Sequence, residues 1–493
     1  MNHFHALLSQ RKIARALAGG AVALAAGGIV LLRAPQHGSA APTTQSGPHS
    51  TATVTHAAPG QAPRAEFRGP WAHGRLALAQ AGVAADGTRQ VFAELRVAAD
   101  DRAMPAGSTR PVAMALVLDV SGSMSGEKLA QAKQSVLEVV DRMRDDDRIS
   151  LVTYSDSARV VQPLARVGDV RAQMHVTVPT IAVEGGTNIP SGLSMGAQTL
   201  VEAPSTLVRR VVLMSDGRDG SNRDLETIAQ EVRTRADQGV MLSSLGVGAD
   251  YDERYMARLA DAGRGNYEFM RDGTQMRAFL ARELQQATRT TVERAVAEVT
   301  LPAGWRLTRA YGCEATVSGQ TVRLPVGALF AGDERRLVLD LAVDAPAAGA
   351  STAGALAAHV AWHVVPEGRD ASVDTGALAL AVVATEAEAA ASRDAAVFGE
   401  AESTVIAARQ FDAVGAWRDG RVAEAQAISQ RNLEALQRIQ AAAPSPARAA
   451  QITQFQSDST NFANMAPASE AGRAYGLGSN ARHRAALRSA SAY

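Results

Sequence analysis

Cysteine and lysine are scarce in this sequence of 493 residues. There is one cysteine, Cys313, and the only lysines are Lys12, Lys128 and Lys133. A single cysteine excludes an internal disulfide and a metal site built from several thiolates. The 50 basic and 50 acidic residues cancel, so nothing in the composition predicts bulk attraction to nucleic acid. The pattern Gly-x-x-x-x-Gly-Lys-Ser/Thr is absent, so nucleotide binding and ATP hydrolysis have no support.

The N-terminal residues carry the pattern of an exported protein. Arg11, Lys12 and Arg15 precede an uncharged, largely apolar run over residues 16–32. Positive charge before such a run keeps the N-terminus inside and sends the rest outside. We predict that residues 1–33 anchor the chain in the inner membrane, with a cleaved signal sequence and a secreted protein as the alternative. The body of the protein is then expected in the cell envelope, in the periplasm or at the cell surface.

Strand-rich segments lie on both sides of a longer mixed region. Residues 34–64 are rich in Pro, Ser, Thr and Gly, have no apolar period and are predicted to be a disordered linker. Residues 65–109 alternate in polarity around an Asp-Gly turn signal, which predicts a β-hairpin. The alternation returns over residues 291–385, and the two segments together predict one β-sandwich.

The mixed region, residues 110–290, alternates buried strands with amphipathic helices. This order predicts an α/β domain, a doubly wound and mainly parallel sheet covered on both faces. The domain would be inserted in the β-sandwich or flanked by it. Residues 386–443 are Ala-rich and periodic, which predicts a C-terminal helical segment. Residues 444–493 are polar and predicted to be a disordered tail.

One stretch organises the α/β domain. Residues 112–119 form an apolar run typical of a buried strand, and the run ends in Asp119. Ser121 and Ser123 follow at alternate positions in a Gly-bearing loop, and residues 127–143 have a helical period. In open α/β sheets, ligands bind in the loops beyond the carboxyl ends of the strands.

Two further loops carry oxygen donors at matching ends of the predicted sheet. Thr187 follows a Gly-Gly pair just before a helix. Asp216 lies in the loop at residues 214–217, which directly follows the strand at residues 207–213. Hydroxyls and carboxylates are hard donors that select Mg²⁺, Mn²⁺ or Ca²⁺ over Zn²⁺ or copper. With few protein ligands and two carboxylates, Mg²⁺ is the preferred cation, and Mn²⁺ or Ca²⁺ are possible.

These motifs resemble a known family. Residues 117–124, 147–154, 185–188 and 213–217 match the von Willebrand factor type A (VWA) domain in order and spacing. The resemblance implies a metal-ion-dependent adhesion site, where two serines and a threonine contact the metal and two aspartates act directly or through water. Carried over to this chain, the implied metal site comprises Asp119, Ser121, Ser123, Thr187 and Asp216. The flanking sandwich is similar in layout to inter-alpha-trypsin inhibitor heavy chains and related bacterial proteins.

The resemblance implies a divalent-metal-dependent, adhesion-type module that binds a protein. An acidic side chain of the partner would complete the coordination of the metal. An alternative from a different class is an envelope assembly factor, or an accessory subunit of an ATPase- or chelatase-type machine. An enzyme is not expected. A nucleophilic Ser121 would need a histidine as its base, and the α/β domain has no histidine other than His175.

Two simpler interpretations compete with a metal site at the sheet edge. The Ser and Asp residues could only cap helices in an ordinary α/β fold, although the agreement of three loops favours a site. His359 and His363 have the spacing of a zinc-binding pair. They lie on a predicted strand with no evident third ligand, so we predict that they are ordinary residues of a sheet face.

Overall fold

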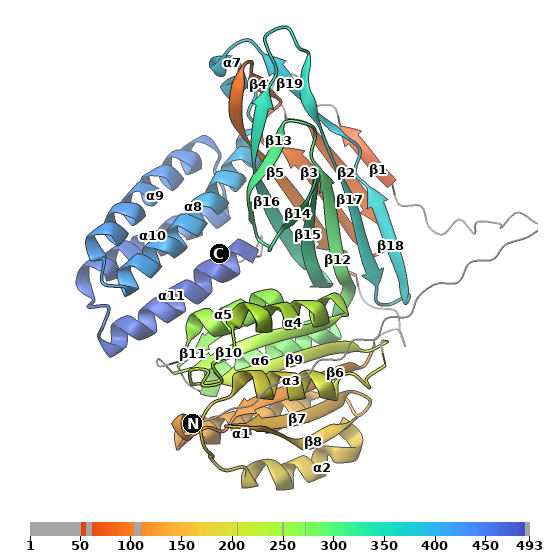
Figure 1. Ribbon diagram of the computed structural model, residues 1–493, viewed down its shortest axis with the longest axis vertical. Helices are drawn as coiled ribbons and strands as arrows, with labels where there is room; N and C mark the ends of the chain where they lie inside the picture. The colour runs from red at the N-terminus through yellow and green to blue at the C-terminus, as the bar shows by residue number, and fades with distance from the viewer. Residues whose placement is uncertain are drawn as a thin grey trace, which may run out of the picture. The chain divides into compact units, whose positions relative to one another are not determined.

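The structure is a computed structural model (Figure 1). The predicted anchor, residues 1–33, and most of the predicted linker lie outside the part of the chain that it describes. Within that part, no helix is both long and apolar enough to cross a membrane. The prediction of export therefore depends on the sequence alone. The residues that the structure describes are 51–55, 62–102, 110–204, 206–248, 251–271 and 273–488.

The α/β domain is built around one sheet. Its strands are β6 (Val112–Asp119), β7 (Arg148–Tyr154), β8 (Ala158–Arg166), β9 (Val208–Ser215), β10 (Val240–Val247) and β11 (Arg264–Met270). They are ordered β11-β10-β9-β6-β7-β8, and all neighbours pair in parallel except β7 with β8. The prediction of a mainly parallel sheet is confirmed. The antiparallel edge strand β8 was not predicted, because none of its residues is buried and it lacks the apolar run of the other strands.

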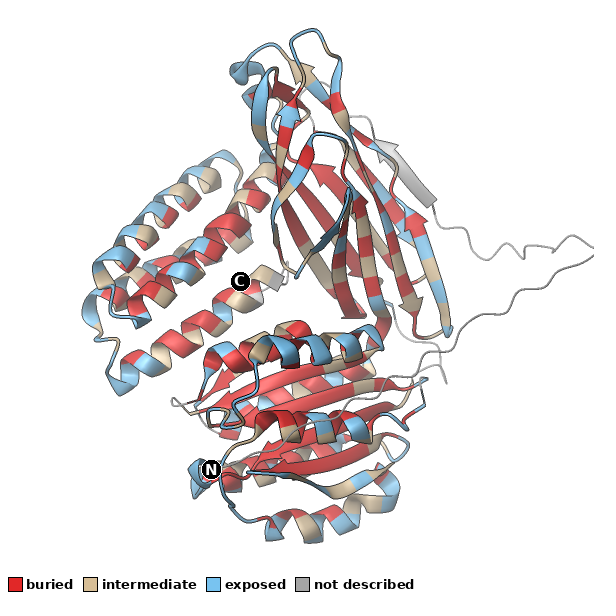
Figure 2. Cartoon of the chain, viewed as in Figure 1, coloured by how far each residue is buried: buried red, intermediate tan, exposed pale blue. Residues whose placement is uncertain are grey.

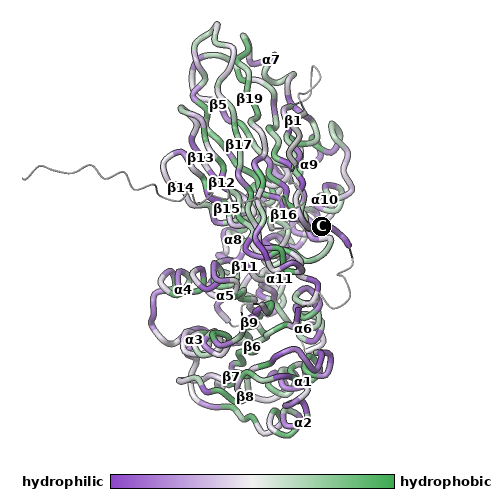
Figure 3. Tube along the Cα trace, turned by 90° about the vertical axis from the view of Figure 1, so that its right-hand side faces the viewer, coloured by the Kyte–Doolittle hydropathy of each residue, from purple (hydrophilic) through white to green (hydrophobic). Residues whose placement is uncertain are grey.

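The central strand β6 is buried at every position, and its side chains alternate between two cores. Met114 and Leu116 belong to the core on one face, and Ala115 and Val117 to the core on the other. Figures 2 and 3 show this strand as buried and hydrophobic. The first core also contains residues of α1 (Glu127–Arg142), α2 (Val167–Thr177) and α6 (Gly273–Thr288). The second contains residues of α3 (Ile189–Thr199), α4 (Leu225–Asp237) and α5 (Glu253–Ala262).

The β-sandwich is assembled from strands on both sides of the α/β domain in the sequence. One sheet has the order β1-β2-β3-β5-β16-β13 and the other β14-β15-β12-β17-β19-β4, with β18 paired to β17. Both sheets contribute to one hydrophobic core. The α/β domain is therefore an insertion between β5 and β12, as predicted. The bounds are β1 (Thr51–Thr55), β2 (Arg64–Gly69), β3 (Ala72–Leu78), β4 (Gly82–Ala84), β5 (Gly87–Ala99), β12 (Thr290–Thr300), β13 (Trp305–Tyr311), β14 (Thr316–Ser318), β15 (Thr321–Phe330), β16 (Glu334–Ala345), β17 (Thr352–Val364), β18 (Arg369–Asp374) and β19 (Leu378–Val383).

Helices follow the sandwich: α7 (Glu386–Ala391), α8 (Ala395–Arg418), α9 (Val422–Ala442), α10 (Pro446–Asn464) and α11 (Glu470–Arg488). The prediction of a disordered tail over residues 444–493 is wrong as far as Arg488. The polar composition was misleading, because α10 needs only a narrow apolar face. Phe455 and Phe462, seven positions apart, are both buried on that face.

The predicted linker, residues 34–64, also needs a correction. Its part at Thr51–Thr55 is strand β1, which pairs antiparallel with β2. The segment is rich in Thr and carries a valine, and β-branched residues favour strands. A strand this short is lost in a composition dominated by Pro, Ser and Gly.

Candidate metal centre

The first loop of the candidate centre begins where β6 ends. Asp119 and Ser121 are buried, whereas Ser123 is exposed in a short 3₁₀ turn at Gly122–Met124. The hydroxyl oxygens of Ser121 and Ser123 lie 3.1 Å apart. The alternate spacing seen in the sequence thus brings the two hydroxyls side by side, above a buried carboxylate.

Asp119 organises this loop from below. Its Oδ1 accepts the backbone N–H of Ser121 at 2.8 Å, and its Oδ2 accepts the hydroxyl of Ser215 at 2.6 Å. Burial raises the pKa of the Asp119 carboxyl, against the hydrogen bonds from Ser215 and Ser121, which favour the ionised form. Both oxygens already have protein donors, so this carboxylate is suited to act on a cation through water.

Asp216 enters from the neighbouring strand. Since β6 and β9 are parallel neighbours, Asp216, which follows the last residue of β9, lies at the same sheet edge as Asp119. Its Oδ1 accepts the hydroxyl of Ser123 at 2.7 Å, and its Oδ2 accepts the ammonium of Lys128. The side chain of Asp216 is fully buried. Two of the predicted loops are therefore joined by direct side-chain hydrogen bonds.

The third loop brings Thr187 to the same place. A β-carbon built on Gly217 would lie 2.9 Å from the Thr187 hydroxyl oxygen and 3.6 Å from that of Ser123. Backbone hydrogen bonds connect the loops, because Gly122 N–H donates to Gly185 C=O at 3.1 Å and Gly220 N–H to Thr187 C=O at 2.7 Å. The structure thus brings all five predicted residues to one edge of the sheet.

The Gly-Gly pair before Thr187 has a steric role. A β-carbon on Gly185 would lie 1.9 Å from Asp156 Oδ2, and one on Gly186 would lie 2.6 Å from Asp156 Oδ1. The two glycines let the loop pass close to this carboxylate, which is itself exposed. The loop can therefore approach the serine pair without displacing Asp156.

The donor set fits a hard divalent cation. Three hydroxyls and two carboxylates converge, and no ring nitrogen or sulfur belongs to the group. Such donors suit Mg²⁺, Mn²⁺ or Ca²⁺. Metal binding by these residues remains a prediction, and the geometry is compatible with it.

Two participants were missed from the sequence, Lys128 and Ser215. Lys128 lies in the first turn of α1 and also donates to the backbone carbonyl of Ser123 at 3.2 Å. Its rarity was an available signal, since it is one of three lysines in the chain. Ser215 carried no signal of its own, because a serine at the end of a strand is common.

Each histidine of the predicted sheet face lies beside a carboxylate of the neighbouring strand. His359 and His363 lie on β17, and the Nδ1 of each is 2.7 Å from a carboxylate of β18, that of Asp374 and Asp370 respectively. Among the described residues, no three His, Cys, Asp or Glu side chains cluster as metal ligands would. The placement agrees with ordinary residues of a sheet face.

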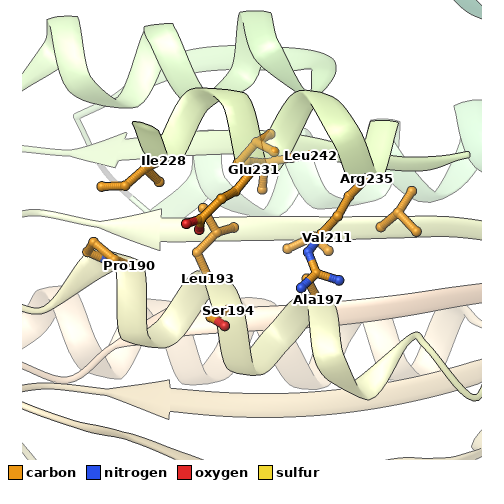
Figure 4. A pocket seen from close by; sticks show the side chains of 11 residues that line it. Pro190, Leu193, Ser194, Ala197, Val211, Ile228, Glu231, Arg235 and Leu242 are labelled. Carbon is orange, nitrogen blue, oxygen red and sulfur yellow. The ribbon is translucent and has the colours of Figure 1, made fainter. Parts of the chain in front are cut away.

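A pocket lies between α3 and α4 (Figure 4). Pro190 and Leu193 line it from α3, Ile228 and Arg235 from α4, and Val211 from the sheet. Its volume of about 30 Å³ leaves room for water but not for an organic ligand. None of the five predicted site residues lines it, so the pocket is separate from the candidate centre.

The fold and the clustered oxygens define an α/β domain with a candidate cation site at the carboxyl edge of its sheet. Residues 114–282 match the family pattern of the von Willebrand factor type A domain. The chain therefore contains a VWA domain, and the prediction made from the motifs is confirmed.

Curated relatives match part of this chain. Protein YfbK of Escherichia coli (strain K12) is 29% identical over 39% of this chain and 34% of its own length. Protein sll0103 of a Synechocystis strain is 26% identical over 37% of this chain and 43% of its own. Inter-alpha-trypsin inhibitor heavy chain H2 of Sus scrofa is 30% identical over 31% of this chain and 18% of its own. The alignments thus span less than half of each relative.

Likeness to solved structures extends beyond the VWA domain. A von Willebrand factor type A protein from Catenulispora acidiphila has a TM-score of 0.61 at 19% identity, over 77% of this chain and 88% of its own. The ArnB paralog VWA2 from Sulfolobus acidocaldarius has a TM-score of 0.58 at 14% identity, over 85% and 99%. At these identities the likeness shows the fold alone, and it includes much of the region outside residues 114–282.

Proposed function

We propose that this chain is a divalent-metal-dependent protein-binding module whose partner supplies an acidic side chain to the metal. The observation that carries the proposal is the convergence of three loops on one sheet edge, where the hydroxyls of Ser121 and Ser123 lie 3.1 Å apart beside Asp216. VWA domains are commonly metal-dependent interaction modules, which supports this function for residues 114–282.

The arrangement of the donors supports an open coordination position. Ser123 is exposed and Thr187 is half-buried, whereas Asp119 and Asp216 are buried beneath them. Neutral hydroxyls would meet the cation from the protein side, so the cation would keep much of its charge. Such a cation attracts an anionic oxygen from outside, and a Glu or Asp side chain of a partner provides one. Mg²⁺ is the proposed cation.

The contacts of the serines and of His175 support binding over catalysis. A serine nucleophile needs a base within hydrogen-bonding reach. The His175 Nε2 lies 2.8 Å from Asp141 Oδ1, so this histidine is engaged by α1 and not by Ser121. We propose that the protein is not an enzyme, and a metal-dependent hydrolase activity of the purified chain would contradict this.

We further propose export with an N-terminal membrane tether. The support is the sequence pattern of Arg11, Lys12 and Arg15 before the uncharged run at residues 16–32. Fractionation of cells that express the full chain tests this part. Recovery in the membrane fraction, with the body accessible to added protease from outside the cytoplasm, is expected. Recovery in the cytoplasm would contradict it.

Calorimetric titration with Mg²⁺ tests the metal site. Asp119→Ala is expected to keep the fold, as judged by circular dichroism, and to lose Mg²⁺ binding and partner capture. Asp141→Ala is the matched control, because it removes a half-exposed carboxylate of the same domain that pairs with His175. Unchanged Mg²⁺ affinity in Asp119→Ala would overturn the proposal.

A pull-down with and without chelator tests the partner class. A chelator-sensitive surface or matrix protein would support adhesion. Recovery of an ATPase instead would favour the alternative role as an accessory subunit of an ATPase- or chelatase-type machine.

A further inference from the structure

The structure places a positively charged side chain, that of Lys128, at the candidate metal site. We infer that Lys128 is a built-in counter-ion that weakens binding of the divalent metal and strengthens binding of the anionic guest to the metal-loaded site. The inference rests on the proposed function and adds a determinant of its selectivity. It assigns to Lys128, which is not one of the five predicted ligands, opposite effects on the affinity for the metal and on the affinity for the guest.

The contacts of Lys128 fix the position of its charge. The ammonium donates to Asp216 Oδ2 and, at 3.2 Å, to the backbone carbonyl of Ser123. Asp216 is fully buried, while Lys128 is 37% exposed. A β-carbon on Gly248 would lie 3.5 Å from the Lys128 ammonium, which is ordinary van der Waals distance, so the loop after β10 passes beside the lysine. The ammonium thus closes one side of the carboxylate that shares Ser123 with the candidate site.

The formal charges explain why this matters. Asp119, Asp216 and Lys128 together carry one net negative charge, and a divalent cation makes the group positive by one. A carboxylate guest then brings the group to neutrality. Without Lys128 the metal-loaded group is already neutral, and the guest adds an uncompensated negative charge. Other charges nearby do not alter this difference, because they are the same with and without the lysine.

Two opposite consequences follow from one charge. The ammonium competes with the metal for Asp216 and repels it, so removing the ammonium should tighten metal binding. The same ammonium attracts the guest, so removing it should weaken guest binding once the metal is present. The partial exposure of Lys128 and screening by salt limit both effects. We expect metal affinity to rise about tenfold and guest affinity to fall about fivefold.

The second lysine of α1 provides a matched control. Lys133 donates to the backbone carbonyls of Pro179 and Ile181, at 2.8 and 2.6 Å. It carries the same charge on the same helix but contacts none of the predicted ligands. Lys133→Met therefore removes the same net charge without touching the site.

Two titrations of the full chain test the inference. The first titrates Mg²⁺ into wild type, Lys128→Met, Lys128→Arg, Lys133→Met and Asp119→Ala. The second measures, by fluorescence anisotropy at saturating Mg²⁺, binding of a labelled peptide of glutamates, with a glutamine peptide as blank. Lys128→Met should bind Mg²⁺ about tenfold more tightly and the glutamate peptide about fivefold more weakly than Lys133→Met. Lys128→Arg, which keeps the charge, should resemble wild type.

The outcomes separate the two proposals. If wild type binds no Mg²⁺, or Asp119→Ala binds it equally well, the proposed function fails. If wild type binds Mg²⁺ but Lys128→Met matches Lys133→Met in either titration, the role of Lys128 is overturned. If Lys128→Arg behaves like Lys128→Met, the effect comes from side-chain shape and not from charge, which also overturns the inference.

Discussion

Two buried carboxylate clusters in this chain look alike in chemistry and differ in access. Asp458 on α10 is fully buried, and so is His483 on α11, whose Nε2 lies 2.6 Å from Asp458 Oδ2. Burial alone would raise the pKa of Asp458, but the hydrogen bond and charge of His483 hold it below its ordinary value. The other donors to this carboxylate also come from α8, α10 and α11: Gln410, Gln454, Tyr475 and Ser479.

The carboxylates of the candidate centre receive hydrogen bonds from several kinds of element. Ser121 and Ser123 lie in the loop after β6, Ser215 is the last residue of β9, and Lys128 lies in the first turn of α1. Asp216 depends on Ser123, an exposed residue, and on Lys128, a partly exposed one. A cluster closed by helices on every side serves packing, because a ligand has no approach to it. A cluster at the edge of a sheet, with an exposed donor such as Ser123, can exchange an internal partner for an external one. The comparison therefore distinguishes a structural carboxylate from a binding one by whether any of its donors is exposed.

The largest effect should come from breaking the closed cluster. Asp458→Ala removes the partner of a buried histidine and of several hydroxyl and amide donors. Loss of one member of such a buried pair costs about 3–5 kcal/mol. Urea unfolding followed by the helical circular dichroism signal measures this, with the exposed Glu434→Ala as control. The Mg²⁺ affinity of Asp458→Ala should remain unchanged. A loss of stability similar to that of the control would show that the cluster is not structural.

The next largest effect should come from stabilisation of the folded state by bound Mg²⁺, which should distinguish the two clusters. Mg²⁺ at about one hundred times its dissociation constant should stabilise the VWA domain by about 2.7 kcal/mol, because only the folded site binds it. Thermal unfolding with and without Mg²⁺ measures the increment. Asp458→Ala should retain it, because distant sites act independently, and Asp119→Ala should lose it. An equal increment in both variants would mean that Mg²⁺ acts elsewhere.

The smallest effect should come from replacing one of two glycines of the VWA domain by alanine. Gly192 has buried surroundings, and Gly185 lies in an exposed loop. A β-carbon on Gly192 would lie 2.5 Å from the ring of buried Tyr154, and overpacking of this kind costs about 1–3 kcal/mol. The atoms nearest to a β-carbon on Gly185 belong to the exposed carboxylate of Asp156, which can swing away. Gly185→Ala should stay within about 0.5 kcal/mol of wild type in chemical unfolding. Equal losses would contradict the view that the loop faces open space.

The sequence predicted those parts of the fold in which the pattern follows burial. Strand β6 is apolar throughout because it is buried on both faces, and its terminal Asp119 and following serines were therefore recognisable. Strand β8 was missed because an edge strand with no buried residue needs no apolar pattern. Helices α10 and α11 were missed because buried polar residues such as Asp458 and Ser479 look solvent-exposed in the sequence.

The residues of the candidate site also divide into those that the sequence pattern predicted and those that it did not. Asp119, Ser121 and Ser123 share one short motif, and Thr187 and Asp216 were assigned because parallel strands end at one edge. Lys128 was missed because its reach to Asp216 depends on how α1 is placed against the loop after β9. Sequence spacing within one helix carries no information about that contact.

The insertion of the VWA domain has a consequence for its release by proteases. The domain leaves the sandwich after β5 and returns to it at β12, so two covalent crossings hold it. A nick in either crossing leaves the domain attached through the other. A partner captured at the sheet edge would therefore stay connected to the rest of the chain after a first cut, and only a second cut would shed it.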